Sequence, residues 1–180
     1  MPINRRTALK NLLIISGGIV LLPSCVHHEG AASIPLKNIS INGEQEKLLA
    51  EISDTIIPKT DTPGAKELFT HLFALTMVDD CFDPARQKEF VAGLNLFNTQ
   101  FKNSYNKNFV DATSAERESF LNDIEHKKFP SKDLSSFYGS MKQLTIHGYM
   151  TSKYVGTNLV IYELVPGRFH GTFPIKTNQA

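Results

Sequence analysis

The chain has 180 residues, of which 41% are hydrophobic, and its formal net charge at pH 7 is +1. A length of this order suits one domain, which can bury ~70% of the surface of its unfolded chain. The near-neutral charge provides no basic excess for binding nucleic acid, and two cysteines are too few for a disulfide-stapled scaffold.

Residues 1–24 have the layout of a signal peptide. Arg5 and Arg6 precede a short apolar run, from Leu12 to Leu22. At ~1.5 Å per residue, a helix of this length cannot cross a hydrocarbon core of ~30 Å. The stretch that begins with the arginine pair is similar to the twin-arginine export signal, with Ala8 where that consensus prefers phenylalanine. An ordinary secretory signal that happens to contain two arginines is the alternative.

The four residues from Leu22 to Cys25 resemble a bacterial lipobox, in which the cysteine receives lipid and becomes the new N-terminus. Several acyl chains anchor a protein stably, because each buried methylene contributes about 0.8 kcal/mol. We therefore expect a lipoprotein on the periplasmic side of a bacterial cell envelope, anchored to the membrane through Cys25. Plain cleavage nearby, with Cys25 left as an ordinary thiol, is the alternative. Residues 25–42 show no sustained period and are predicted to form a tether.

Helical periodicity dominates from residue 43 onwards. Apolar residues recur at three- and four-residue spacing in five stretches, and four of these follow a capping residue or a cap followed by proline. The predicted helices lie around residues 48–56, 63–76, 84–101, 114–124 and 132–145. The predicted fold is therefore mostly all-α: residues 43–180 form a single bundle of about five helices, closed by an extended C-terminal strap.

The strap is predicted from the apolar, β-branched stretch Leu159 to Val165, which is followed by a turn signal at Pro166 and Gly167. Neighbouring side chains of an extended segment point to opposite faces, so one face would pack on the bundle and the other would remain for a second protein. We expect Tyr162 or Phe169, whichever points away from the bundle, to anchor that partner.

The sequence lacks the common catalytic and cofactor-binding motifs. The sequence contains no G-x-G-x-x-G, Walker, G-x-S-x-G or C-x-x-C motif, and none of its six histidines has the spacing of a familiar metal motif. We therefore expect no catalytic, cofactor-binding or metal-binding residues in this chain. Asp79 and Asp80 could serve acid–base chemistry or cap the next turn, and Cys81 could be a reactive thiol or a small buried hydrophobe. The second interpretation is favoured for both.

Three stretches together resemble the gluconate 2-dehydrogenase subunit 3 family, over roughly residues 46 to 174. The first is LLAEISDTIIPKTDTPGAKE, with Ile-Ile-Pro followed by Thr-Asp-x-Pro-Gly-Ala. The second is DDCFDPARQKEFVAGLNLF, with an acid pair, a cysteine and a later Gly-Leu. The third is FYGSMKQLTIHGYMTS, followed by VIYELVPGRFHG with its Pro-Gly turn. Each motif is weak alone, and their order and spacing make the set specific.

The resemblance implies a small, non-catalytic subunit of a membrane-associated flavoprotein dehydrogenase. Its partner would be a large flavoprotein of the glucose–methanol–choline oxidoreductase type, which binds FAD and oxidises a sugar, a sugar acid or a polyol, often with a cytochrome c subunit as electron acceptor. In such complexes the small subunit carries the export signal for both chains, so the twin-arginine pair would serve the flavin of the partner. A free-standing envelope lipoprotein that acts as a binding or scaffold module is the alternative.

The resemblance also directs attention to interaction and folding positions in three segments. The first follows Pro58, the second marks the end of the long C-terminal helix, and the third is the strap. The candidate partner-interface residues are Asp61, Pro63, Gly64, Tyr149, Thr151, Ser152, Tyr162, Pro166, Gly167 and Phe169.

Overall fold

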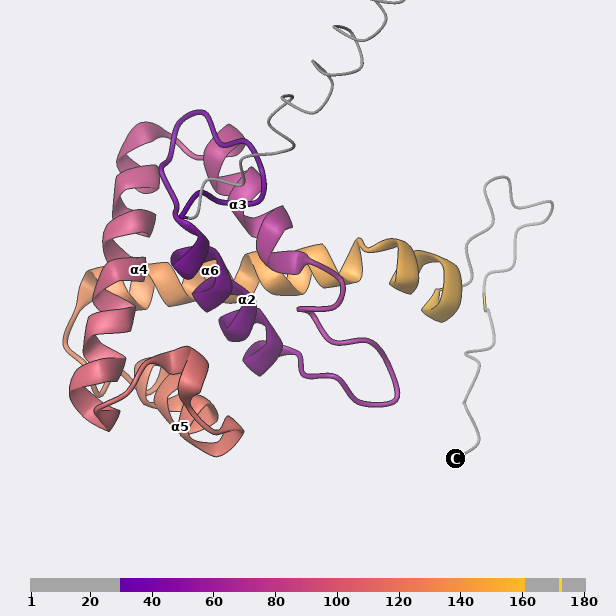
Figure 1. Ribbon diagram of the computed structural model, residues 1–180. Coiled ribbons are helices and arrows are strands. Elements are labelled where there is room, and N and C mark those ends of the chain that lie inside the picture. The colour runs from indigo at the N-terminus through magenta and orange to yellow at the C-terminus, as the bar shows by residue number, and fades with distance from the viewer. Residues whose placement is uncertain (1–29, 161–171, 173–180) are drawn as a thin grey trace, which may run out of the picture.

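A computed structural model describes residues 30–160 and residue 172, and Figure 1 shows their arrangement. The prediction of an all-α fold is confirmed: five α-helices account for most of the described residues, and none of these residues belongs to a strand longer than an isolated bridge. The α-helices are α2 (Gly43–Ile56), α3 (Thr70–Cys81), α4 (Pro84–Tyr105), α5 (Ser114–Glu125) and α6 (Lys132–Met150), and two short helices are η1 (Phe109–Asp111) and η2 (Val155–Leu159).

Helix α6 is the central element, and α2, α3, α4 and α5 all pack against it (Figure 1). The crossing of α4 and α6 is close because Gly93 of α4 lies directly on α6. A Cβ atom at this position would be 2.8 Å from the backbone oxygen of Asp133 and would clash with Phe137. The absence of a side chain at Gly93 therefore sets the distance between the two longest helices.

The helix starts follow the predicted capping residues at three of four places. Asp83 accepts hydrogen bonds from the first turn of α4, in front of Pro84. Thr113 forms a capping box with Glu116 at the start of α5, and Ser131 caps α6. A side-chain oxygen at each of these positions satisfies backbone N–H groups that have no partner inside the helix.

The buried apolar residues of α4, which are Phe90, Leu94, Phe97 and Phe101, lie in the core of the bundle. Phe97 is fully buried, and its ring packs edge-on against Phe109, Phe120 and Phe137 from three other elements. Aromatic pairs favour this edge-to-face geometry, which adds about 0.5–1.5 kcal/mol to the burial of apolar area. These contacts fill the centre of the bundle with aromatic rings.

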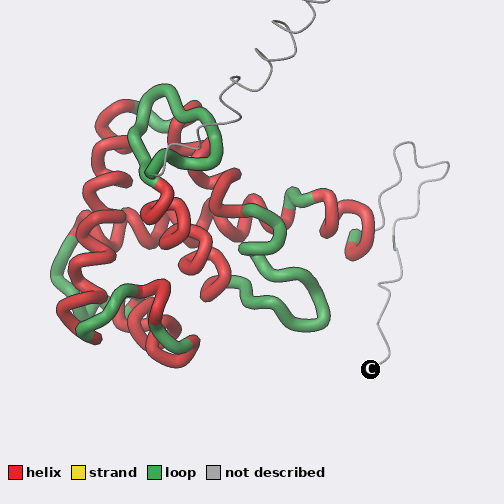
Figure 2. Tube along the Cα trace, in the orientation of Figure 1, coloured by secondary structure: helices red, strands yellow, loops and turns green. Residues whose placement is uncertain are grey.

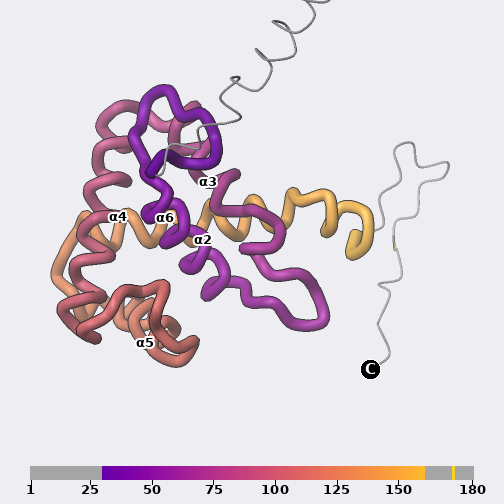
Figure 3. The backbone as a smooth tube through the Cα atoms, viewed as in Figure 1, coloured from indigo at the N-terminus to yellow at the C-terminus, as the bar shows by residue number. Residues whose placement is uncertain are grey.

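The predicted boundary between tether and domain at residue 42 differs from the structure. Residues 31–42 form a loop that packs over α2, α3 and α4 (Figure 3), and both Ile39 and Ile41 are buried in the core. The buried carboxylate of Asp79 accepts hydrogen bonds from three consecutive backbone N–H groups of this loop, those of Lys37, Asn38 and Ile39. The packed domain thus includes at least residues 31–42.

The predicted start of the second helix at Pro63 is wrong. Residues 57–69 form a long loop between α2 and α3 (Figure 2), and α3 begins only at Thr70. Phe69 has a left-handed backbone with φ of 54°, which a continuous helix cannot contain. The predicted strap lies almost wholly outside the described residues, but its first residue, Leu159, is the last residue of the short helix η2.

Candidate functional site

The two motifs that contain most of the candidate interface residues meet in space. The hydroxyl of Tyr149, at the end of α6, donates a hydrogen bond of 3.1 Å to the backbone oxygen of Pro63 in the α2–α3 loop (residues 57–69). The side-chain oxygen of Thr62 lies 3.3 Å from the same hydroxyl. Tyr149 also packs with Ala65 and Val155 in a small apolar cluster separate from the main core. The structure therefore brings Pro63, Gly64 and Tyr149 together.

Gly64 is required by the tight folding of this loop. A Cβ atom at residue 64 would lie 2.7 Å from the backbone nitrogen of Lys59 and 3.2 Å from the backbone oxygen of Ile57. The loop is also braced by Glu67, which binds Lys59 at 2.6 Å and accepts a hydrogen bond from the backbone N–H of Gly64. The role of Gly64 visible here is to permit close approach of two backbone segments.

The other candidate interface residues have local roles or lie outside the described part of the chain. Thr151 is exposed, and its hydroxyl donates a hydrogen bond to the backbone oxygen of His147. The side chain of Ser152 accepts a hydrogen bond from the backbone N–H of Val155. Asp61 is exposed on the loop. Arg5, Arg6, Cys25, Tyr162, Pro166, Gly167 and Phe169 all lie outside the described residues.

An ionic network joins the α2–α3 loop to helices α2 and α5 and to η1. Glu51 of α2 binds Lys66 of the loop and Arg117 of α5, each at 2.5 Å. Arg117 also donates to the backbone oxygens of Phe109 and Val110 in η1. Partial burial raises the pKa of Glu51, but the hydrogen bonds from Lys66 and Arg117 outweigh it and hold the pKa below its ordinary value.

Asp79 is a structural residue, and the two acids of the pair have different environments. Asp79 is buried and Asp80 is exposed. Burial raises the pKa of Asp79, but its three backbone N–H donors lower the pKa by more, so the carboxylate stays ionised at neutral pH. The prediction that the pair caps the next turn is replaced by this finding: Asp79 holds the 31–42 loop, and Asp83 alone caps α4.

Cys81 is exposed, so the prediction of a buried small hydrophobe is wrong. Helix α3 ends at this residue, and its side chain falls on the outer side of the last turn. In residues 30–160, no group of three or more histidine, cysteine, aspartate or glutamate side chains has the arrangement of a metal site. Within the same range, no helix combines the length and the apolar character needed to span a bilayer.

Sequence reasoning missed three consecutive residues, Phe69, Thr70 and His71, of which Phe69 and His71 line a cleft between α2 and α3. Phe69 is 63% exposed in spite of its size, whereas Thr70 and His71 are buried. Among the described residues, the side-chain oxygen of Thr70 and the Nδ1 atom of His71 have no hydrogen-bond partner. Burial lowers the pKa of His71 below its ordinary value of 6.5; Glu46 opposes this effect and Lys66 adds to it. Only the left-handed backbone of Phe69, which sequence does not reveal, turns its ring outward.

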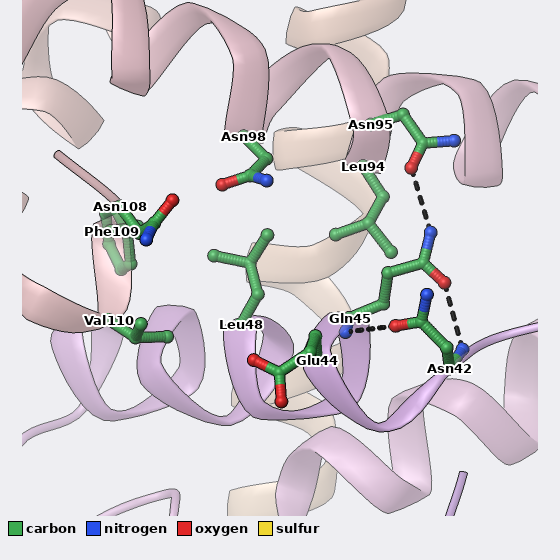
Figure 4. Close-up of a pocket in the computed structure, with 10 residues that line it drawn as sticks. All are labelled: Asn42, Glu44, Gln45, Leu48, Leu94, Asn95, Asn98, Asn108, Phe109 and Val110. Atoms are coloured by element: carbon green, nitrogen blue, oxygen red, sulfur yellow. Dashed lines mark hydrogen bonds between the residues drawn. The ribbon is translucent and has the colours of Figure 1, made fainter. Parts of the chain in front are cut away.

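A second cleft, with a volume of about 350 Å³, lies between the start of α2, the middle of α4 and η1 (Figure 4). Five of its ten lining residues are amides, and three of these are bonded to one another. Gln45 donates to Asn95 and completes the capping box with Asn42. Asn42 and Gln45 therefore have a structural role, because together they cap the start of α2.

The fold and the contact of the two motifs define a small helical protein in which a long loop is clamped to the end of a central helix. The model of the gluconate 2-dehydrogenase subunit 3 family matches residues 43–167, which include both motifs. The chain therefore belongs to the gluconate 2-dehydrogenase subunit 3 family, whose name describes a subunit of a multi-subunit dehydrogenase complex. Comparison with curated proteins and with solved structures gave no match.

Proposed function

We propose that this chain is a non-catalytic accessory and export subunit of a periplasmic FAD-dependent dehydrogenase that oxidises a sugar, a sugar acid or a polyol. The observation that carries the proposal is the family match over residues 43–167, which covers all five α-helices of the described bundle. The partner is a large flavoprotein of the glucose–methanol–choline type, and a cytochrome c subunit accepts its electrons in many such complexes.

The contacts between the α2–α3 loop and the end of α6 support a role in assembly. Pro63 and Gly64 shape a loop, and Tyr149 fastens that loop to α6 through one hydroxyl and one ring. These contacts fix the surface that surrounds the loop. A fixed, pre-formed surface lowers the entropy lost when a partner binds.

The N-terminal features complete the proposal. Arg5 and Arg6 direct the folded complex to the twin-arginine route, and Cys25 anchors it to the membrane through lipid. The FAD belongs to the partner, so the export signal on this chain moves a flavin that the chain itself does not hold.

Purification from native membranes tests the proposal. The tagged full-length chain, solubilised in mild detergent, is expected to bring down a much larger protein and the yellow colour of a flavin. Denaturation of the sample should release FAD, which mass spectrometry identifies. A colourless chain recovered alone, under conditions that keep other membrane complexes intact, would favour a free-standing envelope lipoprotein instead.

A further inference from the structure

The α2–α3 cleft has a volume of about 600 Å³ and is open at the surface. Helix α2 supplies one wall, the α2–α3 loop supplies the other, and His71 is the one lining residue from α3. The residues that line it are Glu46, Lys47, Ala50, Asp54, Lys59, Lys66, Glu67, Phe69 and His71.

Three features of neighbouring residues at this cleft are unfavourable for the free protein. Phe69 combines a left-handed backbone with 63% exposure of a large apolar side chain. Thr70 and His71 each bury a polar atom that lacks a hydrogen-bond partner within the described part of the chain. A strained bulky residue and an unsatisfied buried polar atom each call for an explanation, and both are concentrated at functional sites.

The charges around the cleft indicate what it can accept. Each of the three lysines that line it is already paired with an acid: Lys47 with Glu44, Lys59 with Glu67 and Lys66 with Glu51. These pairs leave little attraction for phosphate, carboxylate or the head groups of anionic lipids. The side chains best placed to contact an occupant are the exposed ring of Phe69 and the imidazole of His71, which lines the cleft although its Nδ1 atom is buried. An apolar side chain next to a neutral hydrogen-bonding group matches both.

We propose that the α2–α3 cleft is the docking site for a loop of the large flavoprotein subunit, and that this loop places an apolar side chain against Phe69 and a backbone amide or hydroxyl against His71. This inference rests on the proposed function, because it names the surface that holds the same partner. Interface energy is concentrated in a few large side chains, often aromatic, and Phe69 is the one phenylalanine, tyrosine or tryptophan among the residues that line the cleft.

The experiment uses the full-length chain in detergent and the FAD-loaded flavoprotein that the membrane purification described above is expected to identify, with their affinity measured by surface plasmon resonance. Phe69→Asn is the main variant, since asparagine tolerates a left-handed backbone better than phenylalanine does. We expect it to leave the melting temperature unchanged or higher and to weaken binding of the flavoprotein at least tenfold. His71→Leu removes the unsatisfied ring nitrogen, and we expect it to retain the fold while weakening binding in the same direction.

Met150→Asn is the matched control. Met150 is 60% exposed, close to the value for Phe69, but it belongs to α6 and does not line the cleft. The proposal expects wild-type affinity for this variant. Wild-type affinity in Phe69→Asn would overturn the docking site while leaving the accessory function intact, as would a loss confined to Met150→Asn. Failure of the wild-type chain to bind the flavoprotein would overturn both proposals. Self-association of the chain that Phe69→Asn abolishes would assign the cleft to a second copy and overturn the inference.

Discussion

The Tyr149 hydroxyl is bonded at 3.1 Å to the backbone oxygen of Pro63, across a separation of 86 residues in the chain. This contact joins the last turn of α6 to the loop between α2 and α3. The Gly-Tyr pair near the end of α6 and the Pro-Gly-Ala sequence far upstream, both within the range that the family model matches, therefore meet in the fold. Gly148 leaves room for Phe73 of α3, and Tyr149 fastens the loop.

Tyr149→Phe removes this hydrogen bond and keeps the ring. We expect the free energy of unfolding, measured by urea denaturation, to fall by about 1 kcal/mol, which is typical for one intramolecular hydrogen bond. Tyr154→Phe is the control, because the hydroxyl of Tyr154 forms no hydrogen bond to another described residue although its ring packs in the same cluster. Equal losses in the two variants would show that the Tyr149–Pro63 bond does not stabilise the loop.

Asp79→Asn replaces the carboxylate that receives three backbone N–H groups with a side chain of the same size that can accept fewer bonds. We expect a loss of about 2 kcal/mol or more in the free energy of unfolding, because buried donors are left unsatisfied. Hydrogen exchange of the amides of Lys37, Asn38 and Ile39 should accelerate. Asp80→Asn, at the neighbouring exposed position, should change the free energy of unfolding by no more than about 0.5 kcal/mol. It should also leave the exchange rates of these three amides unchanged. Unchanged protection of residues 37–39 in Asp79→Asn would contradict the role given to Asp79.

His71 makes stability depend on pH below neutrality. Its pKa is lowered by burial in the folded state, so the unfolded chain binds the proton more strongly. The stabilisation is complete above the ordinary value of 6.5 and decreases as pH falls through the folded-state pKa. The slope cannot exceed about 1.4 kcal/mol per pH unit for one proton.

The measurement compares unfolding of the wild type and of His71→Leu between pH 5 and 7.5. The variant should lack the part of the slope that His71 causes. Glu51 and Asp79 also have lowered pKa values, but the stability they provide is lost only as pH falls below about 4, the region of their ordinary values. Identical slopes in the two proteins above pH 5 would contradict the assignment to His71.

Cys25→Ser tests the lipid anchor. Serine cannot take the thioether-linked lipid, so the variant should incorporate no labelled fatty acid and should either be released from the membrane or remain uncleaved. Cys81→Ser, the matched change at the exposed cysteine of α3, should retain the label. Incorporation of label into Cys25→Ser, or none into the wild type, would exclude the lipobox.

The helices and their core could be predicted from sequence because the signals are local. Asp83-Pro84 and the Thr113 capping box mark helix starts, and the Phe90-to-Phe101 spacing marks one buried face. Residues 31–42 were missed because the partner of their backbone, Asp79, lies about 40 residues away. The predicted helix start at Pro63 is wrong because Gly64 lets residues 57–69 fold into a tight loop. The left-handed backbone of Phe69 then interrupts any helix before Thr70.

Part of the candidate site could be predicted because some of its residues belong to local sequence patterns. Pro63, Gly64 and Tyr149 belong to patterns that the sequence displays, whereas their mutual contact is visible only in three dimensions. The features of Phe69, Thr70 and His71 depend on backbone conformation and burial, neither of which a single sequence reports. Phe69 in particular lies within the predicted helix 63–76, whereas in the structure it precedes α3 and its side chain is exposed.

Export of the flavoprotein is the most direct test of the central claim that this chain carries a folded, FAD-containing partner across the membrane. The variant Arg5→Lys/Arg6→Lys keeps both positive charges and removes the twin-arginine pair. We expect cell fractionation to find both the variant and the FAD-loaded flavoprotein in the cytoplasm, with no dehydrogenase activity in the periplasmic fraction. Normal periplasmic activity of the flavoprotein in cells that contain only this variant would contradict the account.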